Sequence, residues 1–371
     1  MYLTVKSYDE LEHRATGSLP NRIIECCVPV AFLQESYPIR ITSERSAYRY
    51  VDVMQDGRSE DTFKLLIGGI TLDEMEAMRS IARKVGDATE RLYGRRLVPR
   101  SALLRSLNVV RHVRYLLPAG DTLIFEVGAG SGYVGALLLE FGYRYACMDI
   151  TQAFYIWQSH LLQSISADSF VELAVDDMDL QEALDSRRAI HIPWWRFVVL
   201  NPDLRVRING ATCNHALCEM HPNALAHFLF RLHSMLEGRP DGSLIFEGWG
   251  STIRRQIWHV GQAISSAQFV FAHNDVKSSV VVRSDSPAAL FGMKLPHVVG
   301  KHATDEAKYH PNIHVNDKNS ISRILNAGRA ATAQGIRFGL SEFDEMLREV
   351  LGGSDLMTDD ERFMALVHDH R

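Results

Sequence analysis

The sequence has few cysteines, no long apolar run and no excess of positive charge. Its five cysteines are odd in number and include no C-x-x-C pair, a pattern that favours reduced thiols in a cytosol over a disulfide framework. No stretch approaches the ~20 apolar residues that a membrane span needs. With 40 Lys and Arg against 45 Asp and Glu, the formal net charge is −5, which argues against general binding to nucleic acid.

The rest of the composition is that of an ordinary globular protein, with 46% apolar and 23% charged residues. A length of 371 residues allows one large domain or a core with an added unit, and it suffices for a full hydrophobic core. The first six residues lack the basic and then apolar order of a signal peptide, so we expect a cytoplasmic protein. Formation of a homo-oligomer stays open.

The chain divides into three zones, of which the first, residues 1–118, is mainly helical. Thr71 precedes Asp73 and Glu74, which is typical of a helix N-cap with an acidic first turn, and the helical apolar spacing continues to Leu92. A second amphipathic helix is predicted over Ser101–Leu117.

The second zone, residues 119–285, alternates short apolar runs with helical stretches. Such alternation predicts βαβ units, and therefore an α/β fold with a mostly parallel sheet that has helices on both faces. The predicted strands are Leu123–Val127, Arg144–Asp149, Phe170–Val175, Arg196–Asn201, Ser243–Glu247 and Gln268–Ala272.

The third zone, residues 286–371, begins as a loop with prolines and histidines and ends in two predicted helices, Glu342–Leu351 and Asp359–His368. The favoured interpretation of these histidines is that they lie in a solvated loop. A lid over a binding site is a second interpretation. The histidines are His297, His302, His310 and His314.

The strongest motif lies at the end of the first predicted strand, where Glu126 precedes Gly128, Gly130 and Gly132. Glycines allow a tight turn and a close approach of the backbone to a ligand, and the helix that follows offers N–H groups without helical partners. A dinucleotide fingerprint would need glycine at position 133, which is Tyr133, so a dehydrogenase is the weakest alternative. A purely structural turn is another alternative.

The spacing E-x-G-x-G-x-G resembles motif I of the class I S-adenosylmethionine (AdoMet) methyltransferases, whose fold is a Rossmann-like, mostly parallel seven-stranded sheet. The resemblance implies AdoMet as cofactor and S-adenosylhomocysteine (AdoHcy) as product, with the glycine loop under the methionine part and Glu126 near its ammonium group. Asp149, which ends the next strand, would accept hydrogen bonds from the ribose hydroxyls. The other cofactor contacts implied are Ile150 against adenine, Asp176, Asp177 and Met178 near the adenine amino group, and Asn201 beside the methyl group.

Two further segments, residues 149–158 and 214–220, resemble the sugar O-methyltransferase family, although Ala216 stands where a hydroxyl-bearing residue is expected. This narrower resemblance implies a small-molecule acceptor, namely a hydroxyl of a sugar or sugar-containing metabolite, and no nucleic-acid or membrane partner. We expect residues 1–118 and 286–371 to build the acceptor pocket and a lid. Methylation of nitrogen or carbon in an amino acid or natural-product intermediate stays an alternative, as does a non-catalytic binding module.

A hydroxyl acceptor must lose its proton, and His215 is the first candidate for the base. A loop histidine that only packs or caps is the alternative interpretation of His215. Glu219 would orient that histidine or stabilise a helix start, and His221, before Pro222, favours a capping role over a substrate contact. The remaining candidates are Asp203 and Glu247 for catalysis, and Asn214 and Arg111 for the acceptor, with a solvated basic face as the favoured interpretation of Arg111.

A divalent metal is not favoured. His215, Glu219 and His221 are residue types that suit Zn²⁺ or Mn²⁺, but their spacing matches no familiar ligand motif, and one helix cannot place all three on one face. Mg²⁺ held by carboxylates stays open.

Overall fold

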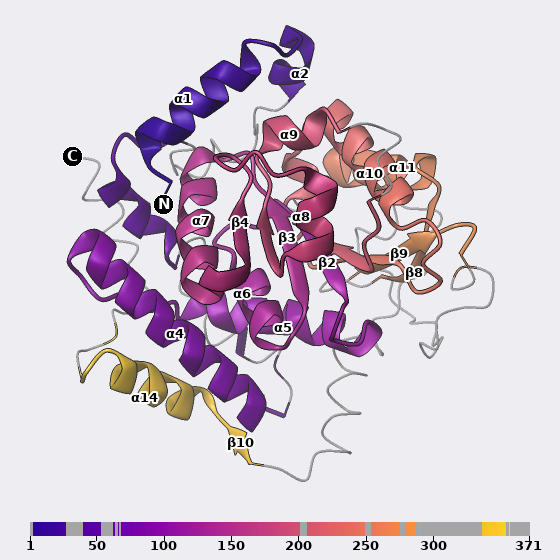
Figure 1. Ribbon diagram of the computed structural model, residues 1–371. Helices are drawn as coiled ribbons and strands as arrows, with labels where there is room; N and C mark the ends of the chain where they lie inside the picture. Colours follow the sequence, from indigo (N-terminus) through magenta and orange to yellow (C-terminus); the bar gives the residue numbers. More distant parts are fainter. Residues whose placement is uncertain are drawn as a thin grey trace.

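An eight-stranded sheet lies at the centre of the protein (Figure 1). The computed structural model describes residues 3–26, 40–52, 62–63, 66, 68–200, 206–248, 254–274, 279–286, 289, 336–353 and 356. The strand order is β4-β5-β3-β2-β6-β7-β9-β8, in which β9 runs antiparallel to both neighbours and the other pairs are parallel. The strands are β2 (Leu123–Val127), β3 (Arg144–Met148), β4 (Phe170–Glu172), β5 (Ala189–His191), β6 (Gly210–Thr212), β7 (Ser243–Phe246), β8 (Phe269–Asn274) and β9 (Ser279–Arg283).

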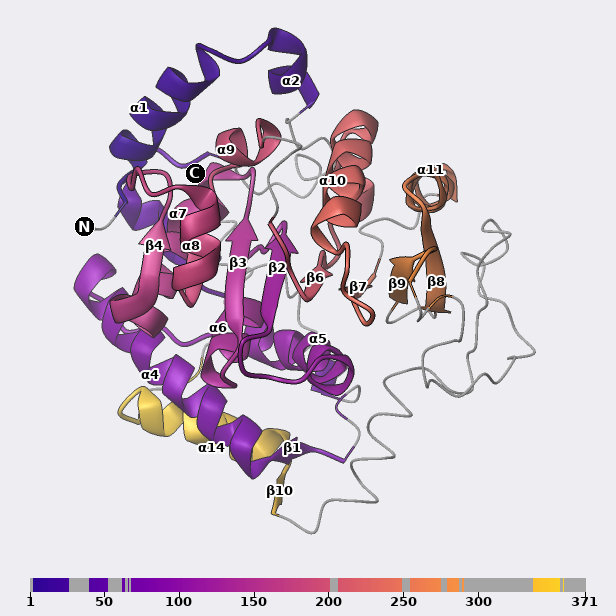
Figure 2. The same ribbon diagram turned by 45° about the vertical axis from the view of Figure 1, so that its right-hand side comes forward.

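Helices cover both faces of this sheet (Figures 1 and 2). On one face, α5, α6 and α7 follow one another and contact strands β3, β4, β5 and β7. Right-handed crossovers between parallel strands put α8, α10 and α11 on the other face. The predicted α/β, Rossmann-like fold is therefore confirmed, with eight strands in place of seven. These helices are α5 (Ser101–Leu116), α6 (Tyr133–Glu140), α7 (Gln152–Ser166), α8 (Leu180–Ser186), α10 (Pro222–Met235) and α11 (Arg254–Ser266).

The order of the strands reverses at β2, which has β3 on one side and β6 on the other. Because all three strands are parallel, they end at the same edge of the sheet. Ligands of open α/β sheets bind outside the carboxyl ends of the strands at such a switch point. The segments that meet there are residues 126–132, 149–151 and 213–219.

The predicted N-terminal helices are present and share one hydrophobic core with the sheet. Thr71 caps α4 in a capping box with Glu74, and Gly94 ends the helix in the left-handed conformation. Helix α4 packs against α6 and α7. The elements of this zone are α1 (Val5–Thr16), α2 (Asn21–Cys26), η2 (Glu44–Tyr50), β1 (Ile70–Thr71), α4 (Leu72–Tyr93) and α5.

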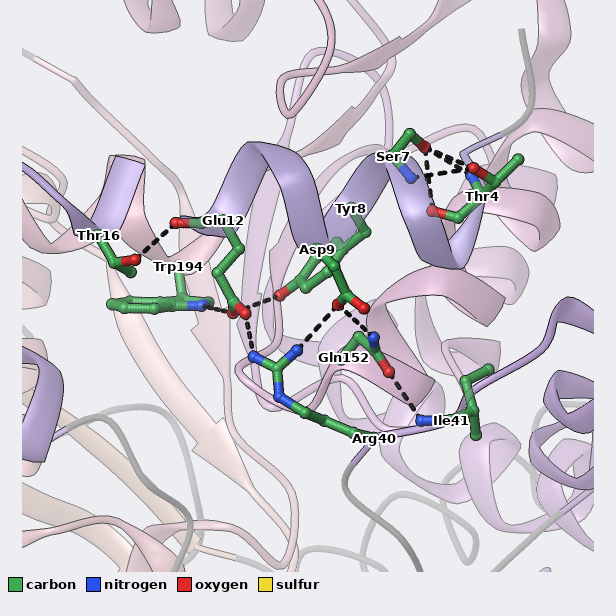
Figure 3. A network of polar contacts seen from close by, with 10 residues as sticks. All are labelled: Thr4, Ser7, Tyr8, Asp9, Glu12, Thr16, Arg40, Ile41, Gln152 and Trp194. Atoms are coloured by element: carbon green, nitrogen blue, oxygen red, sulfur yellow. Dashed lines mark hydrogen bonds and ion pairs between the residues drawn. The ribbon is translucent and has the colours of Figure 1, made fainter. Parts of the chain in front are cut away.

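Helix α1 is anchored beside the start of α7 by a polar network (Figure 3). The buried carboxylate of Glu12 accepts a hydrogen bond from Trp194 Nε1 (2.8 Å) and pairs with Arg40. Asp9 accepts from Gln152 Nε2 (2.6 Å) and from Arg40 Nη1 (2.9 Å). Gln152 is the first residue of α7, so this network joins the N-terminal zone to the segment that directly follows β3.

The predicted helix Glu342–Leu351 is confirmed as α14 (Leu340–Val350), which packs on α4. The preceding strand β10 (Arg337–Phe338) pairs antiparallel with β1, and the guanidinium of Arg100 forms two hydrogen bonds with Asp344. The segment 336–353 is thus attached to the helices that precede the sheet. The predicted helix Asp359–His368 and the loop histidines His297, His302, His310 and His314 lie outside the described residues.

The predicted strand Arg196–Asn201 is wrong, because Trp194–Val198 forms the short helix α9. Trp194, Trp195 and Phe197 are buried in this helix. The guanidinium of Arg196 donates to backbone carbonyls of the segment that follows β4. An apolar run of this length fits a helix or a strand equally well. Strands β5, β6 and β9 were not predicted, and the three-residue β6 takes the place beside β2.

Candidate functional site

The glycine loop between β2 and α6 has positive φ angles at Gly128 (69°), Gly130 (55°) and Gly132 (80°), a region that favours glycine. A Cβ built on Gly128 would lie 3.0 Å from Cβ of Ala216, and one on Gly132 would lie 3.1 Å from Leu161. On Gly130, by contrast, no heavy atom of the described residues would come within 4 Å. Packing therefore requires glycine at two positions, whereas Gly130 faces open space where a ligand can approach.

Side chains of helix α7 hold this loop by hydrogen bonds to its carbonyl groups. Gln158 donates through Nε2 to the carbonyl of Gly130 (2.6 Å), and Trp157 donates through Nε1 to the carbonyl of Ser131 (3.2 Å). The amide of Gly130 in turn donates to Oδ2 of Asp149 (3.1 Å). The predicted glycine loop and the predicted ribose carboxylate are thus in direct contact.

Asp149 is buried at the carboxyl end of β3, with 4% of its surface exposed. Its Oδ1 accepts from the amide of Thr151 (2.9 Å), and its Oδ2 accepts from Gln158 Nε2 (3.1 Å) in addition to Gly130. Burial raises the pKa of Asp149, and these hydrogen bonds together with the nearby His191 counteract part of that rise. The half-buried Ile150 follows directly and packs against the core.

Glu126 is also buried, and its carboxyl group connects β3 with the loop after β6. Tyr145 donates to Oε2 (2.5 Å) and Asn214 Nδ2 donates to Oε1 (3.0 Å). The net pKa of Glu126 is raised from 4.5 to about 8, mainly by burial. The negative charge of Asp149 adds to the rise, and the hydrogen bonds from Tyr145 and Asn214 lower the pKa in part. A cation placed beside Glu126 would favour its ionised form.

Asn214 links Glu126, which precedes the glycine loop, to Glu247 at the end of β7. Its Nδ2 donates to Thr212 Oγ1 (2.5 Å) as well as to Glu126, and its Oδ1 accepts from the amide of Glu247 (3.0 Å). Both ends of the amide are therefore engaged within the protein. Asn214 thus links the carboxyl ends of β2, β6 and β7, and its contact with the acceptor stays a prediction.

His215 lies at the junction of the loop after β6 with the end of β7. It has a positive φ of 56°, and its amide donates to the carbonyl of Glu247 (2.9 Å). Its ring covers Gly248, where a Cβ would lie 2.3 Å from ring atoms. Nη2 of Arg105 lies 2.5 Å from Nε2 of the ring. Because a guanidinium only donates, Nε2 acts as the acceptor and the imidazole is neutral.

Helix α5 contributes two residues to this side that sequence reasoning missed. Arg105 contacts His215, and Asn108 donates through Nδ2 to Oε1 of the buried Glu247 (3.2 Å). The two lie three residues apart, on one face of the helix. The only signal in the sequence was the polar interruption of an apolar helical face at Asn108.

Three other candidates have different positions. Glu219 is half-buried in the turn η4 (Leu217–Glu219). His221 caps α10 by accepting from the amide of Asn223 at Nδ1 (3.2 Å), so the favoured capping role is confirmed. Arg111 is not on a solvated face, since it is 2% exposed and ion-paired with Glu74 (2.6 Å) between α4 and α5, and its contact with the acceptor stays a prediction.

The predicted adenine contacts follow the edge strand of the sheet. Asp176 and Asp177 are exposed and Met178 is half-buried after β4, and β5 separates β4 from β3. These residues therefore follow a strand that is not adjacent to β3, the strand that Asp149 follows. Their contact with adenine stays a prediction. Asn201 and Asp203 lie outside the described residues.

Within the described part of the chain, no three His, Cys, Asp or Glu side chains are grouped so that they could hold a metal ion. The same part contains no helix that is long and apolar enough to cross a membrane.

No protein-family model matches the sequence, and no curated protein matches it. Among solved structures, magnesium protoporphyrin IX methyltransferase from Synechocystis PCC 6803 with bound SAM is 15% identical, with a TM-score of 0.34, over 57% of this chain and 98% of the other. A Burkholderia thailandensis 1,6-didemethyltoxoflavin-N1-methyltransferase is 19% identical, with a TM-score of 0.32, over 47% and 74%. Mitomycin 7-O-methyltransferase is 13% identical, with a TM-score of 0.31, over 49% and 54%. Similarity at this level carries no activity over to this chain.

Proposed function

We propose that the protein is an AdoMet-dependent methyltransferase. The observation that carries the proposal is the glycine loop at the switch point of the sheet, where Gly130 faces open space and its amide contacts the buried carboxylate of Asp149. A ligand that carries a ribose and a flexible, charged side chain fits the combination of this loop and this carboxylate. Three hydrogen bonds from the protein hold this carboxylate beside the loop, where a bound ribose would meet it.

Each end of the cofactor has a partner in this proposal. The carboxylate of Asp149 would accept hydrogen bonds from the ribose hydroxyls, with Ile150 against adenine. The methionine part would follow the open side of Gly130, and its ammonium group would approach Glu126. A cation there would shift the buried carboxyl group, whose pKa is about 8, toward its ionised form. Bound AdoMet supplies a methyl group on a sulfonium, and the protein has to align the acceptor with it.

The acceptor is proposed to be a small molecule that carries a hydroxyl, such as a sugar. The neutral imidazole of His215 supports this, since a neutral ring can accept the hydroxyl proton. The hydroxyl would replace Arg105 at Nε2, and the guanidinium would then lie close to the developing negative charge. Residues 1–118 and 286–371 would complete the acceptor pocket, and a cytoplasmic location is part of the same proposal.

Asp149→Ala tests the ribose contact. We expect AdoHcy affinity to fall by about 1–3 kcal/mol, because hydrogen bonds to a charged group are lost. Isothermal titration calorimetry measures the change, and Asp185→Ala, at an exposed position on α8, is the control that should bind as the wild type does. Unchanged affinity in Asp149→Ala would remove this residue from the cofactor site.

His215→Ala separates acceptor classes. For a hydroxyl acceptor, we expect kcat to fall about 100-fold, since the general base is lost, while AdoHcy affinity stays within about twofold. Methyl transfer from labelled AdoMet to candidate sugars and amines provides the assay. Near-normal turnover on an amine would favour the alternative, methylation of nitrogen. Failure of the wild type to bind AdoHcy at all would leave a binding module of another kind, and binding of NADH in its place would indicate a dehydrogenase.

A further inference from the structure

A buried polar chain runs from the edge of the sheet to Asp149, and the proposed chemistry makes no use of it. Glu172 ends β4 and His191 ends β5, and both are buried together with Gln158 of α7. His191 Nδ1 lies 2.7 Å from Oε2 of Glu172, and His191 Nε2 lies 3.1 Å from Oε1 of Gln158. The other end of Gln158 reaches Asp149 and the carbonyl of Gly130.

The acceptors around Gln158 fix the orientation of its side-chain amide. One end faces the Gly130 carbonyl and the Asp149 carboxylate, which can only accept, so that end must be the NH₂ group. The oxygen therefore faces His191, and Nε2 of His191 must donate to it. A reversed amide would bring three oxygens together without a proton between them.

Glu172, the second partner of His191, holds its ring in place. Burial raises the pKa of Glu172, but attraction to His191 and hydrogen bonds from His191, Tyr155 and Ser159 outweigh it, and the net pKa is lowered. One proton between Nδ1 and Oε2 of Glu172 (2.7 Å) fixes the ring with its Nε2 toward Gln158. The ring of Tyr155 stacks on the imidazole with centroids 3.7 Å apart.

We propose that Gln158, oriented by the hydrogen-bonded pair of His191 and Glu172, is a positioning residue for the ribose-binding carboxylate of Asp149. This inference rests on the proposed function. The N–H at Nε2 of His191 determines which end of Gln158 faces Asp149, and the NH₂ group then holds Oδ2 while donating to Gly130. Oδ1, which accepts only one backbone hydrogen bond among those described, is thereby presented with its second lone pair toward the ribose hydroxyls.

The test compares AdoHcy with its 2′,3′-dideoxy analogue in titration calorimetry. In the wild type, we expect the analogue to bind at least tenfold more weakly, because it lacks the hydroxyls that Asp149 accepts. In Gln158→Met, which keeps the length of the side chain, AdoHcy should bind about tenfold more weakly while the analogue changes by less than about threefold. Gln163→Met is the matched control on the same helix and should keep the discrimination of the wild type.

Equal weakening of both ligands in Gln158→Met would overturn the proposal, because it would indicate a general effect on the loop or the fold. Unchanged binding of both would overturn it as well. Failure of wild-type protein to bind AdoHcy would instead contradict the proposed function, and the inference with it.

A measurement on the wild type keeps the test valid if Gln158→Met does not fold. The side-chain NH₂ resonances of Gln158 should shift when AdoHcy binds and shift clearly less with the dideoxy analogue. Equal shifts with both ligands would contradict a role that acts through Asp149. The ring ¹⁵N signals of His191 should show Nε2 protonated, and an unprotonated Nε2 would contradict the hydrogen bond assigned to Gln158.

Discussion

Gly130→Val is expected to abolish AdoHcy binding while the protein stays folded. The new side chain would extend into the open space beside the loop, where the methionine part of the cofactor is proposed to lie. A loss of at least 1000-fold is expected, because two branched methyl groups would occupy the position of ligand atoms. The φ of 55° adds strain of about 1–2 kcal/mol to the folded state. Calorimetry measures the affinity, and thermal unfolding measures the stability.

Gly142→Val is the matched control for this substitution. Gly142 also has a positive φ, 84°, and a Cβ built there has no described heavy atom within 4 Å. It precedes β3, at the edge of the sheet opposite the proposed site. We expect a similar loss of stability with unchanged AdoHcy affinity. Tight binding by Gly130→Val would mean that the cofactor does not follow the glycine loop.

Glu126→Gln is expected to change the pH dependence of stability. Burial raises the folded-state pKa of Glu126 from 4.5 to about 8, so between these values the folded protein holds a proton that the unfolded chain has released. This contribution to stability is fully present below about pH 4.5 and is lost, by at most about 1.4 kcal/mol per pH unit, as the pH rises to 8. Gln cannot ionise, so the variant should lack this decline and gain on the wild type by several kcal/mol near pH 8.

The same substitution tests the proposed ammonium partner. Binding of a cationic group beside Glu126 favours the carboxylate, so AdoHcy binding to wild type near pH 6.5 should release close to one proton. Calorimetry in buffers with different ionisation enthalpies measures that number. The Gln variant should release none from this position and should bind AdoHcy more weakly. Equal proton release by both proteins would contradict a direct role for Glu126.

Long, strongly apolar segments made part of the fold predictable. Leu123–Val127 is predicted with the bounds that β2 has, because five buried residues form a continuous run between a turn and the glycine loop. The three-residue strands β5 and β6 are too short to show a period, although β6 lies directly beside β2. The strand predicted over Arg196–Asn201 is wrong for a different reason, since an apolar run of this length fits either a helix or a strand.

The proposed site was predictable where its residues are close in sequence. Glu126, Gly130 and Asp149 lie within 24 residues, and their spacing around a strand and a helix already indicates a ligand loop. The contact of Arg105 with His215 joins residues 110 positions apart, and that of Asn108 with Glu247 joins residues 139 apart. Such pairs arise from the packing of α5 against the strand ends, which no local pattern in the sequence encodes.

A crystal structure with AdoHcy tests the central claim most directly. The account predicts the ribose hydroxyls within hydrogen-bond distance of Asp149 and the homocysteine part along the open side of Gly130. It further predicts the amino group near Glu126 and the sulfur facing the loop that carries His215. AdoHcy bound elsewhere on the protein, or absent at saturating concentration, would contradict the assignment of this edge of the sheet as a methyltransferase site.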